Sequence, residues 1–206
     1  HSLVSVESPV PPYTLTESNW GLHYFVDANV ATPAAEPEGA IANGTPKAEA
    51  TIVECKSYTG SIAMLGGGAI EALCQRQHLK NPDSHIAEIT AGGTCLNLAY
   101  THRGVLGELR LPQVEPAPVY DDSRSTIFVA RDSGSVKKSV WTYRRSAVVR
   151  EGVDLGEVRF YKISDADNCA DMFTKPVDHA KFCHLLSHTH KFAPQAKRRE
   201  TVEVEG

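Results

Sequence analysis

Short apolar runs and alternating stretches predict several strands along the chain. Residues 22–26 form an apolar run that ends at Asp27, which is typical of a short strand. The segments SYTGSIAML and GGGAIEALCQ predict two strands joined across three glycines, because glycine tolerates the positive φ of a hairpin turn. Residues 117–120 predict a short buried strand, and the alternating residues 157–163 predict a fifth.

Stretches with helical spacing predict helices between and after these strands. Ser84 is a suitable N-cap for a long helix that places five residues on one face, namely Ile86, Ile89, Gly93, Leu96 and Tyr100. Ser123 predicts the start of a short helix, and residues 137–152 predict another. Residues 168–174 begin a last helix that Pro176 interrupts. We therefore expect an α/β (α+β) fold, a mixed five-stranded sheet with helices packed on it.

The distribution of Pro, Gly and Ala predicts one folded domain with irregular segments around it. Residues 1–20 are rich in Ser, Pro and Thr and predict an extended lead-in, and residues 28–54 predict a surface loop insertion. Residues 187–206 are polar and predict a flexible tail, which leaves residues 21–186 as the domain. The chain begins without Met, so we interpret it as a piece of a longer protein.

The overall composition is that of an ordinary globular protein. A hydrophobic share of 41% and a charged share of 22% exclude wholesale disorder, and no apolar run approaches the ~20 residues that span a bilayer. The formal net charge of -4 argues against a protein that coats nucleic acid through net charge alone. The five cysteines contain no Cys-x-x-Cys pair, which excludes a zinc knuckle and a disulfide framework and favours a reducing compartment.

Four acids stand where strands end or helices begin. Asp27 ends the first strand, Asp122 follows the fourth, Glu88 lies in the first turns of the long helix, and Asp171 lies in the first turn of the closing helix. Converging carboxylates repel one another unless cations lie among them. Oxygen ligands without nearby His or Cys select Mg²⁺ or Mn²⁺, and two such ions can drive hydrolysis of a phosphodiester. Taken singly, each acid is more simply interpreted as an ordinary surface residue.

Five segments around these acids carry a family resemblance. The segments are YFVDANVAT, SYTGSIAMLGGGAIEALCQRQ, IAEITA, VYDDSRSTIFVA and NCADMFTKPV. In order and spacing they resemble the ribonuclease H region of copia-type retrotransposon polyproteins, over about residues 21–186. NCADMFTKPV is the most specific of the five.

The resemblance implies a ribonuclease H-like fold and a nuclease that cuts the RNA strand of RNA–DNA hybrids. It implies that Asp27, Glu88, Asp122 and Asp171 are the catalytic, metal-binding acids and hold two Mg²⁺ or Mn²⁺ ions. One ion would be shared by Asp27, Asp122 and Asp171, and the other by Asp27 and Glu88. Asp121 is a weaker candidate, because strand alternation turns it away from its neighbour. The implied partner is the reverse transcriptase domain of the same polyprotein, in a cytoplasmic particle or the nucleus and without a membrane.

The sequence also departs from this family, which keeps other functions open. Ile86 replaces a common Glu, and Ser123 and Arg124 replace an Asn-Gln pair. One alternative is therefore a domesticated or decayed module that binds nucleic acid or has a structural role without catalysis. Another is a polynucleotidyl transferase such as an integrase, although these enzymes rely on three acids and different flanking segments.

A basic helix is a candidate nucleic-acid contact. Its five basic residues are interleaved with Trp141 and Tyr143 and comprise Lys137, Lys138, Arg144, Arg145 and Arg150. The alternative is a solvated helix face with Trp141 in the core.

Two features near the C-terminal end have ordinary alternatives. His184, His188 and His190 have spacing that suits a transition metal if the segment is helical, but no Cys or acid nearby in sequence completes the set, which favours an exposed polar tail. Thr174 and Lys175 could contact phosphate, or they could cap or cover the helix start.

Overall fold

Five strands form one mixed sheet in a computed structural model that describes residues 21–30, 57–78, 84–131 and 140–189. The strand order is β3-β2-β1-β4-β5. The strands are β1 (His23–Asn29), β2 (Tyr58–Leu65), β3 (Gly68–Arg76), β4 (Ala117–Asp121) and β5 (Val158–Lys162). The pairs β1–β2 and β2–β3 are antiparallel, while β1–β4 and β4–β5 are parallel. The predicted mixed five-stranded sheet is thus confirmed.

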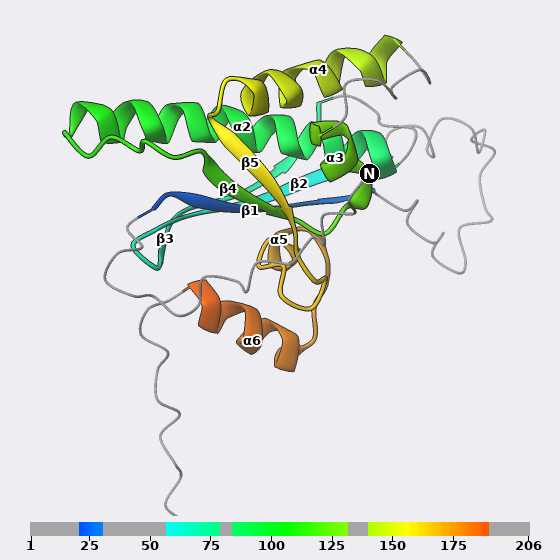
Figure 1. Cartoon of the computed structure of the whole chain (residues 1–206). Helices are drawn as coiled ribbons and strands as arrows, with labels where there is room; N and C mark the ends of the chain where they lie inside the picture. Colours follow the sequence, from blue (N-terminus) through cyan, green and yellow to red (C-terminus); the bar gives the residue numbers. More distant parts are fainter. Residues whose placement is uncertain (1–20, 31–56, 79–83, 132–139, 190–206) are drawn as a thin grey trace, which may run out of the picture.

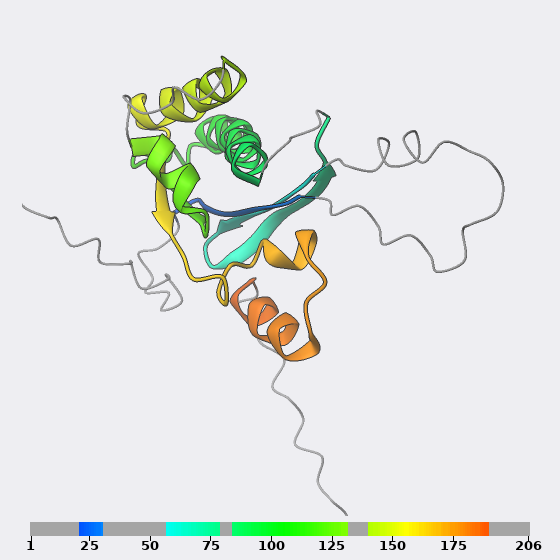
Figure 2. The same cartoon turned by 90° about the vertical axis from the view of Figure 1, so that its right-hand side faces the viewer.

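Helices cover both faces of the sheet. Figures 1 and 2 show α2 (Ser84–Glu108), α3 (Arg124–Arg131) and α4 (Val140–Asp154) on one face, and α5 (Asp171–Thr174) and α6 (His179–Thr189) on the other. The side chains of β1 belong alternately to two cores, because successive side chains of a strand point to opposite faces of the sheet. Tyr24 and Val26 belong to the large core under α2, and Phe25 belongs to the smaller core with Ala170 beside α5.

The hairpin between β2 and β3 follows the glycine signal. Gly66 and Gly67 both have positive φ, at 59° and 80°, a conformation that side chains other than glycine rarely adopt. The predicted turn across these glycines is confirmed. The turn pairs β3 with β2, and β3 is the outer strand of the sheet.

Helix α2 buries part of the predicted face, including Ile89 and Leu96, together with a row of smaller residues that was not predicted. Its buried residues are mostly small and follow i, i+4 spacing, including Ala87, Ala91, Cys95 and Ala99. Tyr100, predicted to be on the buried face, is 39% exposed. Periodicity favours large apolar residues, whereas the sheet here accepts small ones because these let the helix axis come close.

The element boundaries at the C-terminal end also differ from the prediction. Pro176 separates α5 from α6, as predicted, but α6 continues to Thr189, so the expected start of a tail at 187 falls inside the helix. The lead-in 1–20, most of the insertion 28–54 and residues 190–206 lie outside the described residues. Within the described ranges, no helix is long and apolar enough to cross a membrane.

Candidate active site

The four predicted acids come from four separate elements that meet at one edge of the sheet. Asp27 lies near the end of β1, and Asp122 follows β4 directly. Because β1 and β4 are parallel neighbours, their carboxyl ends lie side by side. Glu88 is in the first turns of α2, and Asp171 is the first residue of α5.

The side chains of these acids converge in two overlapping groups. Candidate ligand oxygens of Asp27, Glu88 and Asp122 lie within 4.8 Å of one another, and so do those of Asp122, Asp165 and Asp171. We call these five residues the acid cluster. Asp122 is common to both groups. Sequence reasoning missed Asp165, for which the only signal was the acidic run directly before the last family-like segment.

Glu88 is tied to the strand that carries Asp27. Its Oε2 atom accepts a hydrogen bond of 3.1 Å from the backbone N–H of Ala28. This bond fixes the start of α2 over the end of β1 and thereby holds Glu88 beside Asp27.

A glycine in the neighbouring strand lets α5 approach the sheet. Gly60 lies directly opposite Asp27 in the β1–β2 register. A Cβ atom on Gly60 would lie 2.7 Å from Cγ2 of Thr174 and 2.8 Å from the carbonyl oxygen of Ala170, so only glycine leaves room for α5 here. In this position the Thr174 hydroxyl donates a hydrogen bond to the Asp27 carboxylate.

The loop before α5 is anchored to β1 as well. The side-chain amide of Asn168 donates to the carbonyl of Val26 at 2.9 Å, and its oxygen accepts from the N–H of Ala170 at 3.2 Å. Asn168 is fully buried, so these bonds fix where α5 begins and hence where Asp171 lies.

Two lysines lie against the acid cluster. The Nζ atom of Lys175 is within 4.0 Å of four carboxylates, at 2.9 Å from Asp171, 3.2 Å from Asp27, 3.5 Å from Asp165 and 3.8 Å from Asp122. Lys181 lies 2.7 Å from the other oxygen of Asp171. The sequence suggested phosphate contact or capping for Lys175, whereas its ammonium group here neutralises carboxylates. Sequence reasoning missed Lys181.

Burial makes these acids hard to ionise. It raises the pKa of Asp27 to about 6, against the opposing effects of the Thr174 hydrogen bond and the Lys175 charge. The pKa of Glu88 is strongly raised, first by burial and then by the nearby charges of Asp121 and Asp27. Desolvation also raises the pKa of Asp122. The site therefore favours binding of cations, which stabilise the ionised carboxylates.

Asp121 lies deeper than Asp122 and belongs to neither of the two converging groups. It is fully buried, and its Oδ1 atom accepts a hydrogen bond of 2.6 Å from the N–H of Ser123 at the start of α3. Its Oδ2 atom has no hydrogen-bond partner among the described residues. Burial raises the pKa of Asp121. An acid with this environment adds negative charge behind the cluster when it ionises.

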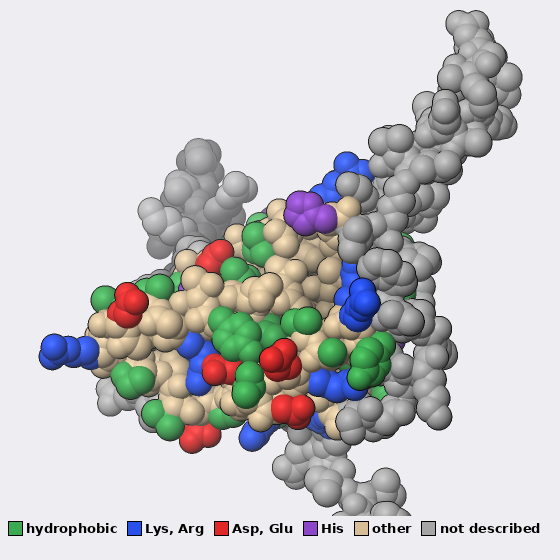
Figure 3. Space-filling view, turned by 90° about the horizontal axis from the view of Figure 1, so that it is seen from above, with side chains coloured by type: hydrophobic (Ala, Val, Ile, Leu, Met, Phe, Trp, Pro, Cys, Tyr) green, Lys and Arg blue, Asp and Glu red, His purple; other side chains and the backbone are tan. Residues whose placement is uncertain are grey.

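The candidate nucleic-acid contacts in the basic helix have different environments. Arg144 is exposed, whereas Arg145 donates to the Thr90 hydroxyl of α2 and Arg150 donates to the carbonyl of Val129 in α3 at 3.2 Å. Lys137 and Lys138 lie outside the described residues. Figure 3 looks onto the side of α2 and α4, where basic, acidic and apolar side chains are interspersed.

Comparison with solved structures identifies the fold. An RNase H1 isolated from compost is similar at a TM-score of 0.51 and 14% identity, covering 75% of this chain and 92% of that one. The protease-reverse transcriptase of prototype foamy virus is similar at a TM-score of 0.50 and 14% identity, covering 84% of this chain and 23% of that one. The N-terminal RNase H domain of a Mycobacterium tuberculosis protein matches at 0.49 and 14% identity, with 75% and 90% covered.

The chain therefore has a ribonuclease H-like fold. No protein-family model and no curated protein matches it.

Proposed function

We propose that this chain is a metal-dependent endonuclease that cuts the RNA strand of RNA–DNA hybrids and comes from a copia-type retrotransposon polyprotein. The observation that supports this most is the meeting of Asp27, Glu88, Asp122 and Asp171 at one sheet edge. These acids are far apart in sequence and lie in the segments that resemble that family. The fold shared with RNase H1 supports the same function.

The residues present fit divalent metal ions. All ligands offered are carboxylate oxygens, the donors that Mg²⁺ and Mn²⁺ prefer. Lys175 already places one positive charge among four carboxylates, and the buried Oδ2 atom of Asp121 has no partner among the described residues. Two ions would be held by overlapping acids: the family resemblance assigns Asp27 to both ions, whereas Asp122 is the acid common to the two groups that converge in the structure. A bound ion lowers the pKa of a water ligand and stabilises negative charge on the departing oxygen.

The chain's own residues prepare this site. Glu88 and Asp27 are held by the backbone of β1, and Asp171 is positioned by the anchored loop before α5. Lys175 and Lys181 stabilise the charges of the acid cluster and would have to yield part of their contacts to bound ions. The hybrid would be steered by basic residues such as Arg144, and the reverse transcriptase domain of the same polyprotein would be the natural partner.

The test is cleavage of a hybrid that carries a labelled RNA strand, with Mg²⁺ present. We expect Asp122→Asn to lower the rate by at least about a hundredfold, since loss of metal stabilisation is worth several kcal/mol. Asp154→Asn is the matched control, because Asp154 is an exposed acid at the end of α4. Undiminished cleavage by the Asp122 variant would refute the proposal.

A decayed or domesticated module that binds nucleic acid without cleavage is the second candidate. Its support is the engagement of both Asp171 oxygens by lysines, which leaves that carboxylate fully paired without a metal. Titration of the chain with Mg²⁺, followed by calorimetry or NMR, separates the two functions. A nuclease binds the ion and shows shifts near Asp122, whereas a decayed site gives no saturable binding.

A further inference from the structure

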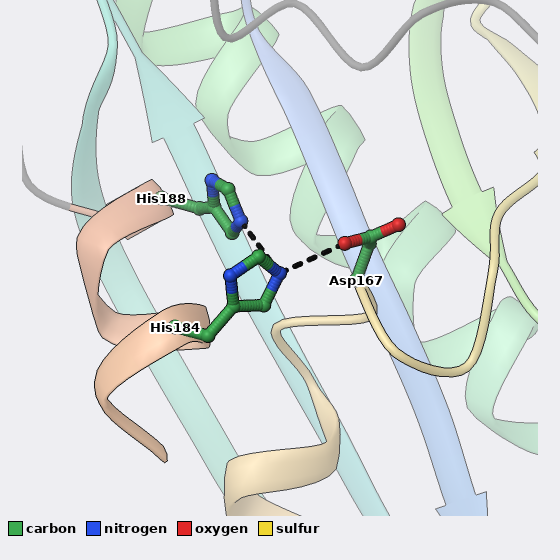
Figure 4. Close-up of side chains that lie close together, drawn as sticks. All are labelled: Asp167, His184 and His188. Atoms are coloured by element: carbon green, nitrogen blue, oxygen red, sulfur yellow. Dashed lines mark hydrogen bonds and ion pairs between the residues drawn. The ribbon is translucent and has the colours of Figure 1, made fainter. Parts of the chain in front are cut away.

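A second group of metal-type ligands lies at α6, outside the acid cluster. His184 and His188 are one turn apart on α6, and Asp167 lies in the loop between β5 and α5 (Figure 4). Their candidate ligand atoms all lie within 4.8 Å of one another. We call these three residues the histidine cluster. The sequence offered no acid near the histidines, but the fold brings one from 17 residues earlier.

We propose that the histidine cluster binds a divalent transition metal ion of the zinc type. Two imidazole nitrogens and a carboxylate oxygen are a ligand set that such ions take, with a fourth position left for water or another group. This set differs from the oxygen-only acid cluster, so the two sites would select different metals. The inference does not depend on nuclease activity.

The distances fit a shared cation. The Nε2 atom of His184 lies 2.9 Å from Oδ1 of Asp167 and 3.2 Å from Nε2 of His188. Ligands of a tetrahedral zinc ion, each about 2.0–2.1 Å from the metal, are about 3.3 Å apart. Both measured separations are within about 0.4 Å of that value. Two of the three separations are thus close to what a tetrahedral ion requires, and the third, between His188 and Asp167, is no more than 4.8 Å.

One proton on the Nε2 atom of His184 can point fully at only one of its two neighbours. The Nε2 atom of His184 has a single position in the ring plane, which holds either a proton or a lone pair. If it carries a proton directed at Asp167, it offers no lone pair to His188, and if it is unprotonated it cannot donate to Asp167. Two protonated rings this close would repel each other. One cation can instead accept lone pairs from all three atoms.

The ion would join α6 to the loop that positions Asp171. That loop already contacts α6, because the Cys169 thiol donates to the carbonyl of Leu185 at 3.6 Å. His184 is about half exposed, so an ion can reach the cluster from solvent without opening the core. The site would thus add to the connection that Lys181 of α6 makes with Asp165 and Asp171.

The experiment uses the full chain without an affinity tag, in excess Mg²⁺ to occupy the acid cluster. Co²⁺ is added as the probe, and its visible absorption reports tetrahedral nitrogen and oxygen coordination. Zn²⁺ is then added to displace it. We expect one strong Co²⁺ site per chain and a rise of the melting temperature on adding Zn²⁺.

Single substitutions locate the site. His184→Ala and His188→Ala should each weaken Zn²⁺ binding at least tenfold to a hundredfold, since even outer partners of ligands have effects of this size. Asp167→Asn should weaken it as well. His179→Ala, an exposed histidine on the same helix, is the matched control and should leave binding unchanged.

Binding of equal strength in the His184 and His188 variants would overturn the proposal, as would absence of a tetrahedral Co²⁺ spectrum in the parental chain. Circular dichroism checks that each variant is folded, and Asp167→Asn provides an independent arm because it leaves both histidines in place. Asp122→Asn should abolish hybrid cleavage without changing the Co²⁺ spectrum, so that failure of one site does not obscure the other.

Discussion

The acid cluster and the histidine cluster lie on two sides of one loop and stabilise charge in opposite ways. Asp165 and Asp167 are two residues apart, yet the first contacts the lysines of the acid cluster and the second contacts His184. Asp27 and Asp171 are almost completely buried and are paired with partly exposed lysines, whereas His184 is half exposed. Ionised carboxylates in a buried site need a nearby cation, whereas an exposed site is stabilised by solvent.

The largest loss of stability should come from removing the positive charge of Lys175. Lys175→Met leaves the buried carboxylates of Asp27 and Asp171 without their closest common positive charge. We expect the free energy of unfolding in metal-free buffer to fall by about 3 kcal/mol, and added Mg²⁺ to restore more stability than in the parental chain. Urea unfolding with and without Mg²⁺ measures both effects.

Two variants calibrate this result. Lys181→Met removes contacts with Asp171 and Asp165 only and should cost less. His184→Ala, in the same metal-free buffer, should cost less than about 1 kcal/mol because its ion pair is exposed. Equal losses in the Lys175 and His184 variants would remove the contrast between the two clusters.

The pH dependence of stability should report the buried acid. The pKa of Asp27 is about 6 in the folded chain and close to its ordinary value of 3.8 when unfolded. Its contribution to stability is therefore complete below about pH 4 and is lost as the pH rises through 6, by up to about 3 kcal/mol. Unfolding in metal-free buffer at a series of pH values measures this fall.

Asp27→Asn removes the titrating group and keeps an oxygen that can accept from Thr174. The variant should lose less stability between pH 4 and 7 than the parental chain. Parallel pH curves for the two chains would show that Asp27 does not titrate in this range.

Disturbing the close packing of α5 against β2 should cause a smaller loss of stability. Gly60→Ala forces a Cβ atom against Thr174 and the backbone of Ala170. We expect a loss of about 1–3 kcal/mol and weaker Mg²⁺ binding, because α5 must move away from Asp27. Gly68→Ala, in the adjacent strand with open space around it, is the control. Unchanged metal binding in the Gly60 variant would show that α5 does not need this contact.

The smallest expected effect concerns the surface of α4. Arg144→Ala should reduce the salt dependence of hybrid binding by a slope of about 1 while leaving stability unchanged, because this side chain is exposed. Arg145→Ala should lower stability as well, since Arg145 bonds to α2. Binding measured over a range of salt concentrations, without cleavage-supporting metal, tests this. An unchanged slope in the Arg144 variant would exclude that residue from the hybrid contact.

The sheet and the four acids could be predicted because their signals are local. Strand alternation, the glycine turn and the family-like segments each occupy a few consecutive residues, and the ends of parallel strands meet by geometry. The convergence of Asp27 with Asp122 follows from that geometry once the strand order is known.

The rest depended on contacts between distant residues. The buried face of α2 is set by how closely the sheet accepts Ala91 and Ala99, which periodicity of large side chains does not show. Lys175 lies in the acid cluster only because Gly60 opens space for α5. Asp167 reaches His184 only because the loop before α5 folds back on α6.

The hydrogen bond between Thr174 and Asp27 joins residues 147 positions apart, and this has a consequence for the order of events during synthesis. Domains tend to fold as the chain emerges, with the N-terminal part first, and distant contacts form late. The strand that carries Asp27 is made early, but its companions in α5 arrive only near the end of the domain. A partly synthesised chain can therefore have the sheet and the group of Asp27, Glu88 and Asp122, while Asp165 and Asp171 complete the acid cluster only near the end of the domain.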